Sequence, residues 1–174
     1  MRIDMASVHI RPWEYGDRHA LAELADNRMI WENVRDYFPS PYTLRHAKEW
    51  IAAHEGKDPP ESFAVVCDGR LAGAVGVFTR TDIYRCTAEL GYWIGEPFWG
   101  RGVASEAVRL VTETAFARDP GLVRVFAEVF VHNTASQRVL EKNGFILESR
   151  RRNAYIKNGR LGDDTVWVRF RDRS

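Results

Sequence analysis

Polar and apolar residues alternate near the start of the chain and then take up helical spacing. Residues 8–13 (VHIRPW) alternate like an edge strand that ends near Pro12. Residues 17–25 (DRHALAELA) place apolar side chains on one side of a helix, with Asp17 as a candidate N-cap. The pattern predicts a strand followed by a helix.

A second region, residues 29–56, has helical spacing that is interrupted by Pro39 and Pro41. Because proline ends or kinks a helix, two helical pieces are expected here. Thr43 is the candidate cap of the second piece and Gly56 its candidate end. The region is unusually aromatic for a loop.

The middle of the chain changes to strand patterns. Residues 62–67 (SFAVVC) and 70–78 (RLAGAVGVF) flank the dipeptide Asp68-Gly69, which is typical of a tight hairpin turn. Residues 87–94 (TAELGYWI) give a further strand. An antiparallel meander is therefore predicted.

A strand, helix, strand unit continues from the meander. A helix is predicted from about Gly102 to Ala117, stopped near Pro120, and residues 123–131 (VRVFAEVFV) give the next strand. A crossover helix returns the chain for parallel pairing, so residues 87–94 and 123–131 are expected to run parallel.

The C-terminal part predicts a short helix over residues 134–143 that ends at Gly144. Two strands follow, from about Ile146 and Arg160, joined at Asn158-Gly159. The complete order indicates an α/β (α+β) fold with a mixed, mostly antiparallel sheet of six to seven strands flanked by about four helices.

Composition narrows the function classes. The chain has 174 residues without repeats or linkers, so residues 1–174 are expected to form one domain. Its 25 Lys and Arg residues balance 24 Asp and Glu residues, and a net charge of +1 provides no field for nucleic acid or an anionic membrane. Cys67 and Cys86 match no metal spacing and are expected to be reduced thiols, so no metal is predicted. The N-terminal residues lack a signal-like apolar run, which favours the cytoplasm.

A glycine turn opens the predicted helix in the stretch YWIGEPFWGRGVASEAVRL. Unpaired N–H groups and the helix dipole make such an end suitable for a phosphate, and Gly100 and Gly102 let a ligand approach the backbone. Arg101 is able to add a charged contact. The alternative is a turn that needs glycine only for its dihedral angles. The Walker loop and the dinucleotide fingerprint both fit this stretch badly.

The residues Trp99-Gly100-Arg101-Gly102-Val103-Ala104 resemble the core motif [QR]-x-x-G-x-[GA] of the GNAT superfamily of acyl-CoA-dependent N-acetyltransferases, with Trp99 as a departure at the first position. The whole stretch and the later VHNTASQRVLEKNGF (Val131 to Phe145) are similar to the branch of ribosomal-protein N-terminal acetyltransferase-like enzymes. The resemblance implies acetyl-CoA as the acyl donor and a primary amine as the acceptor.

The resemblance also implies where coenzyme A lies. The turn would hold the pyrophosphate, and the backbone of Tyr92 to Ile94 would pair with the pantetheine arm where this strand and the strand 123–131 splay apart. The implied coenzyme-binding residues are Tyr92, Trp93, Ile94, Trp99, Gly100, Arg101, Gly102, Val103, Ala104, Ser105, Asn133 and Ser136.

Two residues are candidates for the chemistry. Many members of the superfamily have a tyrosine acid where this chain has Leu140, so by family analogy Ser136 becomes the donor to the thioester sulfur and Asn133 holds the pantetheine amide. A thiol with a pKa near 8.5 needs only a weak donor. The alternative is that Asn133 is an ordinary N-cap and Ser136 an ordinary residue of the first helical turn.

Glu89 is the candidate base, because strand alternation places it on the same face as Gly91 and Trp93, where partial burial would raise its pKa. The alternatives are a solvated or arginine-paired Glu89, with deprotonation through ordered water.

Acceptor-side candidates come from the aromatic region and from the end of the chain. Aromatic rings with carboxylates suit a cationic amine, although each residue separately is also typical of a core or a solvated surface. The candidates are Trp31, Glu32, Asn33, Asp36, Tyr37, Phe38, Tyr42 and Tyr155. His132 is expected to be structural, and Arg150, Arg151 and Arg152 are expected to alternate along a solvated strand.

The sequence therefore predicts an N-acetyltransferase that moves an acetyl group directly from acetyl-CoA to a protein N-terminus or a small-molecule amine, as a monomer or homodimer. The alternative of a different class is a non-catalytic module that binds acyl-CoA or a protein partner, and Leu140 is the residue that favours it.

Overall fold

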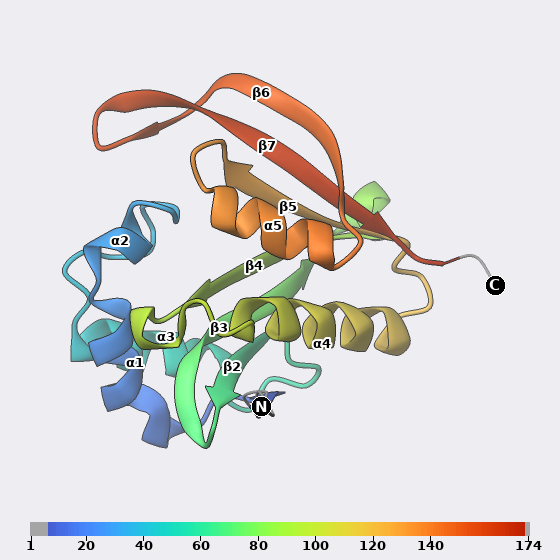
Figure 1. Cartoon of the computed structure of the whole chain (residues 1–174). Helices are drawn as coiled ribbons and strands as arrows, with labels where there is room; N and C mark the ends of the chain where they lie inside the picture. Colours follow the sequence, from blue (N-terminus) through green and yellow to red (C-terminus); the bar gives the residue numbers. More distant parts are fainter. Residues whose placement is uncertain (1–6, 173–174) are drawn as a thin grey trace, which may run out of the picture.

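A seven-stranded sheet forms the centre of the molecule in a computed structural model that describes residues 7–172 (Figure 1). Residues 1–6, which belong to the N-terminal stretch predicted to lack a signal segment, lie outside this range. The strands are β1 (Val8–Arg11), β2 (Ser62–Cys67), β3 (Arg70–Thr79), β4 (Thr87–Ile94), β5 (Arg124–Phe130), β6 (Ile146–Lys157) and β7 (Arg160–Phe170), in the spatial order β1-β2-β3-β4-β5-β7-β6. Only the β4–β5 pair is parallel.

Helices cover this sheet on both sides. Within the described residues they are α1 (Arg18–Ala25), α2 (Arg28–Trp31), α3 (Leu44–His54), α4 (Val103–Arg118) and α5 (Thr134–Lys142). The predicted fold class and the parallel crossover are confirmed. The first of the two helical pieces expected in residues 29–56 is the single turn of α2, which is four residues long.

Two tight turns place the hairpins as predicted. Asp68 and Gly69 have φ values of 50° and 76°, and Asn158 and Gly159 have 51° and 71°. Two consecutive left-handed residues match the twist of antiparallel strands, which explains the Asp-Gly and Asn-Gly sequences. The second of these turns closes the long β6–β7 hairpin that arches over the molecule in Figure 1.

Of the two predicted N-caps, Thr43 caps its helix and Asp17 does not. The hydroxyl of Thr43 accepts the N–H of His46 at 3.5 Å, so Thr43 caps α3 as predicted. Asp17 precedes α1 but makes no side-chain cap. Its carboxylate instead accepts two hydrogen bonds from Arg11 at 2.7 and 2.8 Å, because an available guanidinium competes with the helix N–H groups.

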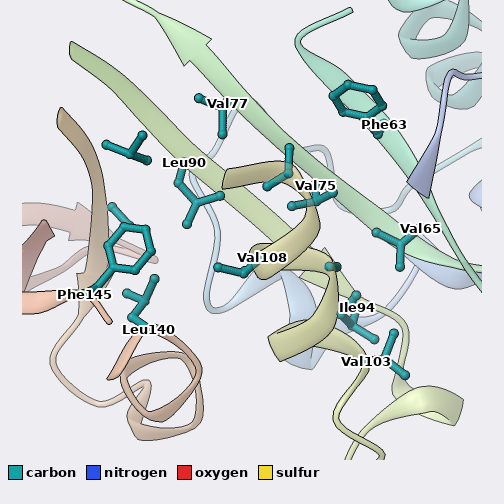
Figure 2. Packing of buried hydrophobic residues seen from close by; sticks show 14 of the residues in the cluster. Phe63, Val65, Val75, Val77, Leu90, Ile94, Val103, Val108, Leu140 and Phe145 are labelled. Carbon is teal, nitrogen blue, oxygen red and sulfur yellow. The ribbon is translucent and has the colours of Figure 1, made fainter. Parts of the chain in front are cut away.

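The main core lies between the sheet and the α4–α5 side (Figure 2). Strand residues such as Val75 and Leu90 pack against Val103 and Val108 of α4 and against Leu140 of α5. A second cluster, which includes Trp13, Leu21 and Ile51, packs α1 and α3 on the opposite face. Each fully buried aliphatic side chain contributes roughly 1.5 to 3 kcal/mol, so both faces of the sheet are held firmly on either side of β4.

Residues 7–172 contain neither a membrane-spanning helix nor a cluster of metal-binding side chains. None of the helices there combines the length and the apolar character needed to cross a bilayer. In the same residues no three His, Cys, Asp or Glu side chains group as a metal site.

Candidate active site

A gap opens in the sheet between β4 and β5. Their parallel pairing is limited to Thr87–Glu89 opposite Arg124–Phe126. Beyond Glu89, β4 remains paired with β3 as far as Ile94, and β5 remains paired with β7 as far as Phe130. The facing edges of the two strands are therefore unpaired from Leu90 onward, which is the splay that the resemblance implied.

The β4 edge offers backbone groups to this gap. The N–H of Gly95 donates to Ala72 at 2.8 Å, toward β3, so in an extended strand the backbone groups of Tyr92 and Ile94 point the other way, into the gap. The indole N–H of Trp99 donates to the Ile94 carbonyl at 2.7 Å. The N–H and C=O of Tyr92 and the N–H of Ile94 are left to pair with an extended amide chain.

The glycine turn lies directly before α4. Gly100 and Gly102 have φ values of 72° and 77°, and Gly102 is the N-cap of the 16-residue helix. A Cβ added at either glycine would meet no atom within 4 Å. Glycine is therefore required by the dihedral angles, and the space in front of the helix N-terminus is open. Both properties fit a bound phosphate.

The residues next to the two glycines are of two kinds: some are exposed beside the turn, and others pack on the core. Arg101 forms an ion pair with the exposed Asp68, beside the turn. Trp99 is 44% exposed, whereas Val103 is fully buried against the sheet and presents only its backbone. Ala104 packs partly on the core, and the Ser105 carbonyl accepts the side-chain amide of Asn143 at 3.1 Å. The side chains of Val103 and Ala104 therefore support the turn rather than contact a ligand.

Ser136 lies at the gap, on the first turn of α5. Asn133 is the N-cap of this helix, and its side-chain oxygen accepts the Ser136 N–H at 3.2 Å. The Ser136 hydroxyl is 2.5 Å from the hydroxyl of Tyr92, which reaches across from β4. Burial raises the pKa of Tyr92 to about 12. Leu140 is fully buried in the core, so α5 supplies no second hydroxyl from that position.

Ser136 and Glu89 approach the gap from opposite faces of the sheet. Along β4, Leu90 and Tyr92 pack on the α4–α5 core, whereas Trp93 packs on the α1–α3 cluster. Glu89 shares the face of Trp93 because strand side chains alternate. A cleft of about 1340 Å³ is lined by residues of both faces, including Glu89 and Ser136, so it passes through the gap.

Glu89 belongs to a chain of alternating charges on the floor of this cleft. Its carboxylate pairs with Arg35 and, at 3.5 Å, with Arg80. Arg35 also pairs with Glu128 at 3.0 Å. Glu89 is partly buried, as predicted, with 20% of its side chain exposed, and it is also paired with arginines, as in the alternative.

The same chain of charges continues into the C-terminal hairpin. Arg151 contacts Glu128 at 3.0 Å and the buried Asp164 at 2.5 Å. Hydrogen bonds to Asp164 and to Glu128 raise the pKa of Arg151. Arg150, Arg151 and Arg152 are exposed on strand β6, as predicted, but they do not simply alternate. A bulge between Arg151 and Tyr155 interrupts the register, and both Arg151 and Arg152 line the cleft.

The segment after α2 covers the acceptor side of the cleft. Lys157 contacts Asp36 at 2.7 Å and lies 3.6 Å from the centre of the Trp31 ring. The side chains of Asn33 and His132 are 3.0 Å apart. These contacts join the segment to the β5 and β6 side of the gap. Trp31 does not line the cleft, because Lys157 and Arg28 already cover its ring.

The remaining acceptor-side candidates differ in exposure. Tyr37 lines the cleft and is 76% exposed, and Tyr155 lines it while stacking on Phe130 at 4.0 Å. Tyr42 is 7% exposed and packs on Phe38, and burial raises its pKa to about 12. Glu32 is exposed and pairs with Arg28. Tyr37 and Tyr155 are thus the accessible aromatic groups of the predicted set.

Sequence reasoning missed Arg35, Glu128, Arg151 and the hydroxyl of Tyr92. Glu128 left a signal, since it is the one carboxylate in the otherwise apolar end of the strand AEVFV. Arg35 left none, because it belongs to no motif and reaches Glu89 across 54 positions of the chain.

Comparison with known proteins identifies the family. A model described as an acetyltransferase (GNAT) domain matches residues 7–146. The chain belongs to this GNAT acetyltransferase family. The probable N-acetyltransferase YjcK of Bacillus subtilis is 32% identical over 92% of both chains. The ribosomal-protein-serine acetyltransferase of Escherichia coli is 31% identical over 63% of this chain and 60% of its own.

Solved structures of GNAT proteins share the fold. A RimL ribosomal L7/L12 α-N-protein acetyltransferase in complex with coenzyme A has a TM-score of 0.81 at 22% identity, with 94% of each chain covered. A spermidine N-acetyltransferase from Vibrio cholerae, in complex with coenzyme A and spermine, has a TM-score of 0.77 at 25% identity, with 94% and 95% covered. The chain is accordingly a GNAT acyltransferase with acetyl-CoA as its donor substrate and resembles the ribosomal N-acetyltransferase branch.

Proposed function

We propose that this acetyltransferase acts on the N-terminal amine of a peptide or protein. The observation that carries the proposal is the charge balance of the cleft. Every carboxylate that lines the cleft is already paired with an arginine or a lysine of the chain: Asp36, Glu49, Glu89, Glu128 and Asp164. A polyamine would require several free carboxylates, whereas a peptide N-terminus brings one cation.

The accessible side chains of the cleft support the same acceptor. Tyr37 and Tyr155 would contact the acceptor chain, with Asn33 at the rim and Tyr42 behind Phe38. Trp31 acts only through its contact with Lys157.

Acetyl-CoA would enter from the α4–α5 face. The glycine turn would bind the pyrophosphate, the Tyr92 to Ile94 edge would pair with the pantetheine, and the thioester would lie in the gap beside Ser136. Asn133 would orient the pantetheine through its side-chain amide while its oxygen caps α5.

Transfer is direct in this proposal. The acceptor nitrogen attacks the thioester carbonyl from the Glu89 face, the C–N bond forms, and the C–S bond breaks with its electron pair on sulfur. Ser136 donates to the departing sulfur, and Glu89, or a water that it holds, receives the proton of the amine. No covalent intermediate on the enzyme is needed.

The cellular compartment, the domain organisation and the oligomeric state are also part of the proposal. We place the protein in the cytoplasm, since Cys67 and Cys86 are free thiols. We also propose that residues 1–174 act as one domain, as a monomer or homodimer, without nucleic acid or membrane, in keeping with a net charge of +1.

The test is thiol release from acetyl-CoA against Ser- and Ala-starting peptides, spermidine, an aminoglycoside and free amino acids. Each peptide has an Nα-acetylated version as its matched control. We expect turnover with the free peptides only. Turnover with spermidine or another small amine would contradict the proposed acceptor. Tight acetyl-CoA binding with no thiol release from any amine would favour a non-catalytic module.

A further inference from the structure

Tyr92 carries a hydroxyl for which the reaction described above has no role. Its oxygen lies 2.5 Å from the Ser136 hydroxyl and 3.3 Å from the Ser136 carbonyl. The ring is packed on the main core, and the hydroxyl crosses the gap from β4 to α5. The contact therefore ties the two walls of the gap together at the candidate acid.

Either hydroxyl is able to donate in the 2.5 Å contact. We assign the donated proton to Tyr92, because a phenol is a stronger acid than an alkyl alcohol and is therefore the better donor. When Tyr92 donates to the Ser136 oxygen, the Ser136 proton is free to point elsewhere. The unpaired stretch of the gap is the open side, so this proton is directed toward the position of the thioester sulfur.

We propose that Tyr92 is a positioning residue that orients the Ser136 hydroxyl toward the sulfur of acetyl-CoA and stabilises the thiolate as it forms. The proposal rests on the proposed function. As the C–S bond breaks, sulfur takes the electron pair, Ser136 donates a hydrogen bond to the thiolate while keeping its proton, and Tyr92 strengthens that donor through its own hydrogen bond. Tyr92 keeps its proton throughout. The proton that the amine loses leaves on the opposite face of the sheet.

The packing explains why this hydroxyl comes from a strand. Leu140 is fully buried, so its position on α5 faces the core and not the gap. Tyr92 reaches the same helix from the other wall. Because burial raises its pKa to about 12, it remains a hydrogen-bond donor throughout the usual assay range.

The experiment compares wild-type protein with Tyr92→Phe, Ser136→Ala and the double variant. Tyr84→Phe is the matched control, since Tyr84 is 63% exposed and outside the cleft. We expect Tyr92→Phe to lower kcat by about tenfold, the loss of one strong hydrogen bond, with KM for acetyl-CoA nearly unchanged. In the Ser136→Ala background, removing the Tyr92 hydroxyl should have no further effect on kcat.

A second readout needs no acceptor. The ultraviolet absorbance of the thiolate reports ionisation of bound CoA, and we expect that ionisation to require a higher pH in Tyr92→Phe than in wild type. An unchanged kcat with unchanged CoA ionisation would overturn the proposal, as would a Tyr92→Phe loss that persists in full without Ser136. If wild type acetylates no amine, the proposed function fails, and the CoA titration alone then decides whether Tyr92 acts on the sulfur.

Discussion

The two faces of the sheet at the gap present different kinds of groups to their substrates. The α4–α5 face offers backbone N–H groups, two left-handed glycines and a pair of hydroxyls. The opposite face offers a chain of paired charges from Arg80 to Asp164 and a covering segment joined to the hairpin by Lys157. The first face has mostly uncharged groups, with the Arg101–Asp68 ion pair beside the turn, whereas the second is crossed by a chain of ion pairs.

The difference follows from what each face has to recognise. The donor carries phosphates and an extended amide chain, which backbone N–H groups and a helix N-terminus are able to hold. The acceptor varies from enzyme to enzyme, and its recognition depends on side chains that each chain arranges for itself. Substitutions on the α4–α5 face should therefore change KM for acetyl-CoA, and substitutions on the opposite face should change KM for the acceptor.

The largest effect is expected at Glu89. Glu89→Gln removes the candidate base, and we expect kcat/KM, measured from initial rates with the acceptor varied, to fall by about 100-fold. The matched control is Glu128→Gln, which removes another partner of Arg35 but lies on β5. Equal losses in both variants would assign the effect to Arg35 and not to proton transfer.

A tenfold effect is expected at the glycine turn. Gly102→Ala places a methyl group in the open space before α4, so KM for acetyl-CoA should rise about tenfold while KM for the acceptor stays constant. Gly159→Ala is the control, because Gly159 also has a positive φ and open surroundings but closes the distant hairpin. Both variants should lose about 1 to 2 kcal/mol of stability, measured by urea unfolding. An equal rise in KM would remove the turn from acetyl-CoA binding.

Two arginine variants should each change one Michaelis constant by about threefold, one for acetyl-CoA and the other for the acceptor. Arg101→Met removes a cation beside the turn, so KM for acetyl-CoA should rise, and the rise should shrink with added salt. Arg35→Met removes one of the two arginine partners of both Glu89 and Glu128, which makes these carboxylates more attractive to the acceptor cation, so KM for the acceptor should fall. Initial rates with each substrate varied in turn measure both constants. A shared effect on both constants would argue against separate faces.

A substitution distant from both faces of the gap, at Asp17, should alter the stability of the protein but not KM for acetyl-CoA or KM for the acceptor. Burial disfavours the charged form of Asp17, but hydrogen bonds from Arg11 and the Glu14 backbone outweigh it and lower the pKa of Asp17. The charged Asp17 therefore stabilises the fold fully at pH values above its pKa in the unfolded chain, and this stabilisation is lost as the pH falls through its lower pKa in the folded protein. Asp17→Asn should lower the free energy of unfolding by about 2 kcal/mol at pH 7, and the difference from wild type should shrink below about pH 4.

Urea unfolding at both pH values measures this difference. The control is Glu113→Gln, which breaks an exposed ion pair with Arg109 and should change stability by less than about 1 kcal/mol. A pH-independent loss in Asp17→Asn would show that the lost stability comes from packing and not from charge.

The sequence was most informative where local rules decide the structure. The Asp-Gly and Asn-Gly turns, the Thr43 cap and the left-handed glycines before α4 were all predictable, because each depends on residues within a few positions. The gap itself was implied only by family resemblance. Strand patterns specify which residues face the core but not where two parallel strands stop pairing.

The charge chain could not be predicted, because its members come from distant segments. Arg35 meets Glu89 and Glu128, which are 54 and 93 positions away. Alternation also failed at Arg151 and Arg152, since a bulge with Asn153 in a left-handed conformation turns both toward the cleft. Long-range ion pairs and bulges depend on tertiary packing, which no local pattern records.

The gap between β4 and β5 has a kinetic consequence. Each substrate reaches the reacting carbon by its own entrance, so binding of one need not block binding or departure of the other. Both must be present before any bond changes, which means that lines in a double-reciprocal plot at several fixed acetyl-CoA concentrations should intersect and not run parallel. For the proposed acceptor, the sheet would separate the two substrates everywhere except at the gap, so that a protein N-terminus approaches from one face while CoA is exchanged at the other.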